Sequence, residues 1–156
     1  MKRRTSFKLG PVLFVLAAML NQKALHGKRD PKKGEKLFRE TCAACHLVRG
    51  TGKAVGSDLT GEKNRAEETM ILDVLAPNRE NTAGYATHIL TTGKGETLAG
   101  LLLAEAPGNV TMRDLAGNDQ VILRKEIAKM ETTKASLMPE GLEQVLSPKD
   151  LADLIA

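Results

Sequence analysis

The sequence predicts a mainly α-helical domain that carries a small inserted antiparallel β-meander, an α+β arrangement. Apolar residues recur at helical spacing in residues 31–42 and 62–76, and a third helix is predicted after residue 147. Residues 85–125 change to four short runs of strand-forming residues, which glycine- and proline-containing turns separate. Short connections favour antiparallel pairing of consecutive strands, so we expect a meander inserted between the second and third helices.

The first residues of the chain predict an export signal. Four of the first eight residues are basic, and residues 9–20 form an apolar run that is short for a membrane span. We interpret residues 1–27 as a signal peptide, with an uncleaved membrane anchor as the alternative. Residues 28–156 then form one domain, with the β insertion at about 85–125.

The charge of the chain is distributed unevenly. It has 23 Lys and Arg, 19 Asp and Glu, and a net charge of +4 at neutral pH. Five basic residues and no acidic ones lie within residues 1–27, which leaves 18 basic against 19 acidic residues and a net charge of −1. The basic surplus belongs to the predicted signal, so we expect no nucleic-acid partner. We expect membrane association only if that segment stays uncleaved.

The strongest functional signal is the pentapeptide CAACH at residues 42–46, which contains both cysteines of the chain. This spacing is typical of covalent attachment of a c-type haem, with thioethers at Cys42 and Cys45 and with His46 as an iron ligand. A redox dithiol and half of a zinc site are the alternatives. The other histidines, His26 and His88, stand alone, and no βαβ pattern follows, so we favour one covalent haem c.

Capping residues mark the starts of two predicted helices. Asp30 and Pro31 give an N-cap followed by proline at the first helical position, before the helix that leads to the CAACH motif. Ser147, with Asp150 three residues later, marks the last helix in the same way. Gly34 lies on the apolar face of the first helix and permits close approach of another helix.

The segment after the motif is glycine-rich and too broken for a helix or strand. We expect it to wrap one edge of the haem. Its backbone near Gly56 and Ser57 is predicted to present a carbonyl to the free ring nitrogen of His46, which fixes the tautomer and strengthens the ligand.

A second iron ligand is predicted at Met138. Pro139 bars helical structure at this position, so the methionine lies on a loop before the last helix and can bring a thioether to the iron. The alternative is a buried loop methionine. Met70 and Met130 are interpreted as core residues, and His88 as a strand residue rather than a ligand.

Four pieces of the sequence occur together: Gly34-x-x-x-Phe38-x-x-x-Cys42-x-x-Cys45-His46, Gly56-Ser57-Asp58-Leu59, Met138-Pro139 and Leu146-Ser147-Pro148-Lys149-Asp150-Leu151. With them the chain resembles a class I cytochrome c over roughly residues 31–156. More narrowly, it resembles the haem-binding domain of the Pirellula/Verrucomicrobium type, in which a strand-rich insertion precedes a loop like that at residues 136–142.

The resemblance implies a mainly α cytochrome c-like fold with the inserted meander, and the following site residues: thioethers at Cys42 and Cys45, His46 as proximal ligand and Met138 as distal ligand. It also implies that Arg65 lies near the haem propionates. Ser57 departs from the family pattern, because proline usually stands there in Gly-Pro-Asp-Leu. This change keeps the backbone carbonyl that His46 needs.

We therefore expect an exported, periplasmic c-type cytochrome that carries single electrons and performs no bond chemistry of its own. Its expected partners are redox proteins, such as a dehydrogenase or another cytochrome. A haem-based sensor or binder of small ligands is one alternative, and an electron-accepting subunit of a dehydrogenase complex is another.

Overall fold

The computed structural model describes residues 28–79 and 84–156. The predicted signal at residues 1–27 lies outside this part of the chain. Within the two described ranges, no helix has the length and apolar character needed to cross a bilayer.

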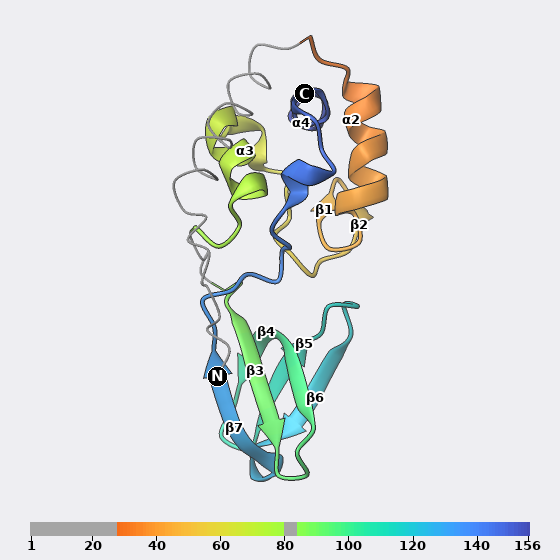
Figure 1. Ribbon diagram of the computed structural model, residues 1–156. Coiled ribbons are helices and arrows are strands. Elements are labelled where there is room, and N and C mark those ends of the chain that lie inside the picture. The colour runs from red at the N-terminus through yellow and green to blue at the C-terminus, as the bar shows by residue number, and fades with distance from the viewer. Residues whose placement is uncertain (1–27, 80–83) are drawn as a thin grey trace, which may run out of the picture.

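The chain forms a helical part and a separate five-stranded sheet (Figure 1). The helical part contains α2 (Pro31–Leu37), η1 (Phe38–Cys42), β1 (Leu47–Val48), β2 (Thr51–Gly52), η2 (Glu62–Asn64), α3 (Glu67–Leu75), η4 (Leu142–Gln144) and α4 (Pro148–Leu154). The sheet lies below it and contains β3 (Thr87–Thr92), β4 (Thr97–Glu105), β5 (Asn109–Arg113), β6 (Asp119–Leu123) and β7 (Ile127–Thr132), with the short helix η3 (Arg124–Glu126) between the last two strands.

Both predicted helix caps are confirmed. The Asp30 side chain accepts hydrogen bonds from the first turn of α2, with Pro31 at its start. Ser147 and Asp150 form a reciprocal capping box at α4. These caps satisfy amide groups that have no partner within the helix, so each short helix begins at a fixed residue.

Helices α2 and α4 cross in direct contact at Gly34. A Cβ at this position would lie 1.9 Å from the carbonyl oxygen of Asp153, so only glycine fits. The prediction that Gly34 permits close helix approach is confirmed. The core of the helical part is formed by α3, the turn before α4, and α4 itself. Its buried residues are Ile71, Leu75, Leu146, Leu151 and Ala152.

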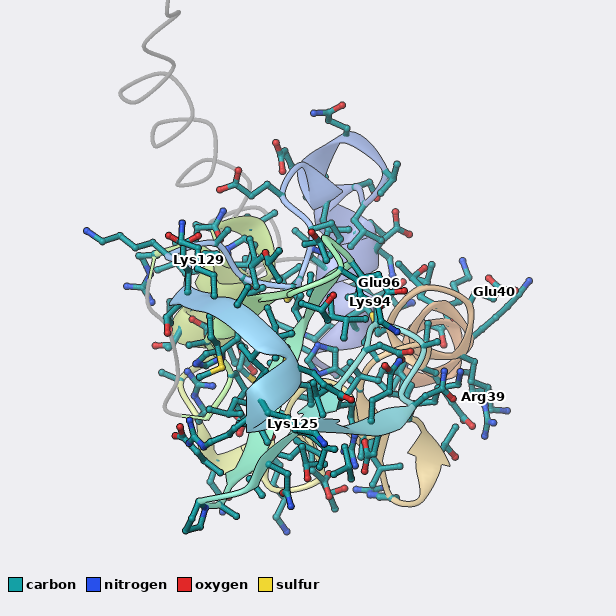
Figure 2. All side chains as sticks on the ribbon, turned by 90° about the horizontal axis from the view of Figure 1, so that it is seen from below. Arg39, Glu40, Lys94, Glu96, Lys125 and Lys129 are labelled. Carbon is teal, nitrogen blue, oxygen red and sulfur yellow. The ribbon has the colours of Figure 1, made fainter. Side chains whose placement is uncertain are left out.

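The sheet has the strand order β6-β5-β4-β3-β7, and all its neighbouring strands are antiparallel. It has a core of its own, built from Leu90, Val110, Met112 and Ile122. Charged side chains of both signs project from the surfaces of the two parts in Figure 2, where the following are labelled: Arg39, Glu40, Lys94, Glu96, Lys125 and Lys129.

The expectation of a mainly α fold is wrong. The antiparallel meander exists as β3 to β6, but the sheet has a fifth strand, and its strands together contain more residues than the three described α-helices. The helices are also shorter than expected: α2 passes into a π-helix at Phe38, and α3 begins only at Glu67.

The fifth strand, β7, begins at Ile127, beyond residue 125, where the predicted strand region ends. Ile127 and Met130 are three residues apart, a helical spacing, yet both pack against the sheet core. A β-bulge explains this, because Thr92 pairs with Ile127 while Thr91 pairs with Lys129, so Ala128 is an extra residue. The bulge interrupts the alternation of apolar and polar residues by which a strand is detected in a sequence.

Candidate haem-binding site

The CAACH motif begins at the end of a π-helix and closes as a tight turn. The Ala43 amide donates to the carbonyl of Phe38, five residues back, at 2.8 Å. The amides of Cys45 and His46 then both donate to the carbonyl of Cys42, at 3.0 and 2.9 Å. Single π-turns are frequent at functional sites, and this one fixes the backbone from which the two thiols and the imidazole project.

Both cysteines are free thiols and half-buried. Burial raises the pKa of Cys42 above its usual value, and the neighbouring Cys45 raises it further. A redox dithiol needs the opposite shift, because the thiolate is the attacking form. Among the described residues, no group of three or more His, Cys, Asp or Glu is arranged to hold a metal ion.

His46 is held by one hydrogen bond and one close backbone contact. Its Nδ1 lies 2.9 Å from the carbonyl oxygen of Ser57. A carbonyl only accepts, so Nδ1 carries a proton, and in the neutral ring Nε2 is the nitrogen with the lone pair that a metal needs. The expectation that the backbone near Gly56–Ser57 would hold this ring is confirmed, and the serine that replaces proline provides the carbonyl.

Gly56 lies against the face of the imidazole. A Cβ at this position would lie 2.6 Å from Cε1 and 2.9 Å from Nδ1 of His46. The amide of Gly56 also donates to the carbonyl of Cys45 at 2.7 Å. The glycine therefore lets the backbone approach the ring closely enough for the next residue to accept from Nδ1.

A small hairpin follows the motif, in a segment expected to contain no strand. β1 and β2 pair antiparallel, and the turn between them places Arg49 at φ 47° and Gly50 at φ 80°. Two positive φ values in succession are the signature of a type I′ turn. The strands have only two residues each, which is too short for a repeating pattern, and Gly50 was the only local signal.

Met138 lies in the loop between β7 and η4, as the position of Pro139 predicted. Its amide donates to the Ser136 hydroxyl at 3.1 Å, and the Ser136 amide donates to the Asn78 side chain at 2.6 Å. Met138 is half-buried. These contacts tether the loop to the end of α3, and the role of Met138 as an iron ligand stays a prediction.

Two other residues considered from the sequence, Arg65 and His88, form hydrogen bonds within the protein. Arg65 donates to Glu62 at 2.8 Å and to Asp73 at 2.6 Å, and these hydrogen bonds raise the pKa of its guanidinium. Its contact with haem propionates stays a prediction. His88 lies in β3, with its Nδ1 3.0 Å from the carbonyl oxygen of Ala86.

Sequence reasoning missed the residues that join the sheet to the proximal loop. Arg113, at the end of β5, donates to the carbonyl of Ala54 at 2.6 Å, and the Lys53 ammonium donates to the carbonyl of Ala116 at 3.1 Å. The partners are about sixty residues apart in the chain, and nothing in a single sequence pairs them.

One comparison with known proteins gives a match. The family model described as Cytochrome c matches residues 31–156, which include the CAACH motif, the sheet and α4. No curated protein matches the chain significantly.

Proposed function

The chain belongs to the cytochrome c family, and on that premise we propose that it is a carrier of single electrons with His46 and Met138 as axial iron ligands. The family match supports a haem-binding electron-transfer protein whose haem c is attached covalently. The narrower likeness to the Pirellula/Verrucomicrobium type stays a prediction.

The single observation that carries the proposal is the hydrogen bond between His46 and Ser57. The Ser57 carbonyl oxygen lies 2.9 Å from His46 Nδ1 and accepts a hydrogen bond from it, so Nε2 is the nitrogen available to iron. Cys42 and Cys45 are half-buried free thiols within four residues of this ring, which fits thioether attachment. When bound, the haem supplies an iron that gains or loses one electron.

The chain's own residues have limited tasks in this function. His46 stays fixed between the Ser57 carbonyl and the Gly56 backbone. Met138 offers a soft thioether from a loop that Ser136 ties to Asn78. A methionine ligand raises the reduction potential, and a preorganised pair of ligands keeps structural change small when the electron moves.

The first experiment tests covalent attachment. The protein is expressed with a working cytochrome maturation system, and haem is detected by staining after denaturing electrophoresis and by intact mass. We expect the mass of one haem. Cys42→Ala and Cys45→Ala should each lose one thioether and lower the yield, whereas unstained wild-type protein would contradict the proposal.

The second experiment tests Met138. We expect Met138→Ala to lose the ferric sulfur-to-iron charge-transfer band and to bind CO rapidly in the ferrous state. Met130→Ala is the matched control, because Met130 packs against the sheet core and its loss affects stability rather than ligation. Rapid CO binding by the wild-type ferrous protein would instead favour a sensor or ligand binder.

We further propose that the protein is exported and exchanges electrons with redox proteins such as a dehydrogenase or another cytochrome. The basic and apolar N-terminal residues support export. The half-buried state of Cys45 supports an accessible haem edge, which brief electron-transfer contacts require. Cell fractionation tests the first claim, and stable co-purification with a dehydrogenase would indicate a subunit rather than a free carrier.

A further inference from the structure

Residues 53–57, the bridging segment, follow the β1–β2 hairpin and are bonded to the CAACH motif. Three of its amides donate hydrogen bonds to carbonyls of the motif, at 2.7 to 3.0 Å: Lys53 to Ala43, and Val55 and Gly56 to Cys45. Its last residue, Ser57, accepts the hydrogen bond from His46. The position of this segment therefore decides where the partner of the imidazole lies.

The other side of the bridging segment contacts the turn between β5 and β6. Figure 1 shows this turn rising from the sheet toward the loop after β2. Arg113 donates to the Ala54 carbonyl at 2.6 Å, and Lys53 donates to the Ala116 carbonyl at 3.1 Å. Gly117 lies against Val55, since a Cβ on that glycine would be 3.3 Å from a Val55 methyl. Val55 is only 2% exposed.

Arg113 is itself held in place by a carboxylate. Its Nε and Nη2 donate to the two oxygens of Asp119, at 2.6 and 2.8 Å, which leaves Nη1 for the Ala54 carbonyl. A bidentate pair of this kind fixes the plane of the guanidinium. The remaining donor, Nη1 of Arg113, is therefore held in the direction of the bridging segment.

We propose that Arg113 is a positioning residue for the proximal iron ligand. The inserted sheet, through Arg113 and the β5–β6 turn, holds the bridging segment so that the Ser57 carbonyl stays within hydrogen-bonding distance of His46. The sheet thereby contributes to the reduction potential of the iron. This inference rests on the proposed function for the iron, but the positioning of the segment is a property of the chain.

The direction of the effect follows from the chemistry of the imidazole. A hydrogen bond from Nδ1 to a carbonyl makes the ring a better electron donor at Nε2 and favours ferric iron. When Arg113 is removed, the Ala54 carbonyl exchanges its charged donor for water, and the bridging segment becomes free to open. The Nδ1 hydrogen bond then weakens, so the reduction potential rises.

The experiment compares Arg113→Ala with Arg124→Ala in the haem-loaded protein. Arg124 is a matched control, because it also pairs with a carboxylate, Glu105, and donates to a backbone carbonyl, that of Ala106. Both partners lie at the end of β4 or directly after it, away from the bridging segment. Two quantities are measured: the reduction potential, and the hydrogen-exchange rates of the Val55 and Gly56 amides.

We expect Arg113→Ala to speed exchange of these two amides about tenfold relative to Arg124→Ala, the effect of losing one hydrogen bond to a charged donor. We expect the ferrous-to-ferric ratio at a fixed electrode potential to rise by about threefold, less than the tenfold or greater effects of altering a direct partner of a ligand. Lys53→Met, which removes the second tie, should shift both quantities in the same direction.

The inference is overturned if Arg113→Ala and Arg124→Ala have the same potential and the same exchange rates. Should Arg113→Ala fail to fold, Arg113→Lys replaces it, because one ammonium cannot hold Asp119 and Ala54 together. An unchanged potential in that variant overturns the inference equally. Wild-type protein without covalent haem would instead contradict the proposed function, while faster amide exchange would still support the positioning of the segment.

Discussion

A methyl group added at Gly56 tests whether the bridging segment must touch the proximal histidine. In Gly56→Ala the new Cβ would lie 2.6 Å from Cε1, 2.9 Å from Nδ1 and 3.0 Å from Nε2 of His46. Gly56 does not have a left-handed backbone, so alanine fits its φ angle. The predicted effect is therefore entirely steric.

The size of the effect follows from the displacement that the methyl group requires. Carbon atoms in ordinary contact are about 3.5–4.0 Å apart, so the ring and the backbone must separate by about 1 Å. Overpacking of this kind costs about 1–3 kcal/mol. The separation also lengthens the 2.9 Å hydrogen bond between His46 and Ser57, whose loss costs about 0.5–1.5 kcal/mol.

We expect Gly56→Ala to lose about 2–4 kcal/mol of unfolding free energy and to show a higher reduction potential. Denaturant titration and potentiometry measure the two quantities. Gly61→Ala is the control, because Gly61 has φ −88° and no atom lies within 4 Å of a Cβ there. If the two alanine variants have equal stability and equal potential, close contact between Gly56 and His46 is not required and the reasoning fails.

Two further predictions concern the crossing of α2 and α4. In Gly34→Ala the Cβ would lie 1.9 Å from the Asp153 carbonyl oxygen, so we expect denaturant titration to show a loss of about 3 kcal/mol or more of unfolding free energy. The control is Gly108→Ala, whose Cβ would meet nothing within 4 Å. Equal stability of the two variants would contradict this prediction. Hydrogen bonds from Lys149 and from the Asp30 amide hold the pKa of Asp153 below its usual 3.8. The ionised Asp153 thus stabilises the fold above that pH, and this contribution is lost as pH falls through the lowered pKa. We therefore expect the unfolding free energy of Asp153→Asn to fall less steeply than that of the wild type as pH is lowered. Equal slopes of unfolding free energy against pH would contradict the lowered pKa of Asp153.

The parts of the site that the sequence predicted are those set by local chemistry. Cys42, Cys45 and His46 lie within five residues, so their spacing alone brings their side chains to one turn. The cap at Asp30 depends on the first turn of its own helix. The carbonyl for His46 was predictable because the Gly56–Ser57 segment follows closely, although the hydrogen bond spans eleven residues.

The parts that could not be predicted depend on pairing across the chain. β7 was missed because the bulge at Ala128 gives Ile127 and Met130 a helical spacing, and only the free edge of β3 makes that segment a strand. The contact between Arg113 and Ala54 spans 59 residues. An arginine followed six residues later by an aspartate looks like an ordinary surface ion pair.

The topology of the insertion explains how a whole sheet fits between the proposed iron ligands. β3 and β7, the first and last strands of the sheet, are neighbours, and the Thr133 amide donates to the Thr87 carbonyl at 2.8 Å. The chain therefore leaves the sheet beside the point where it entered, and Ser136 reaches Asn78, which precedes the insertion.

An insertion whose two ends meet places little constraint on the domain that receives it, so the Met138 loop returns to α3 whatever lies between. The sheet also makes a contact that the return of the chain does not require, because Arg113 donates to the Ala54 carbonyl in the segment that holds His46. The sheet thus contacts the segment that holds His46, while the loop that leaves the sheet carries Met138. If the sheet served only as a spacer, the hydrogen bond from Ser136 to Asn78 would suffice to return the chain to α3, and removing Arg113 would have no effect on the iron.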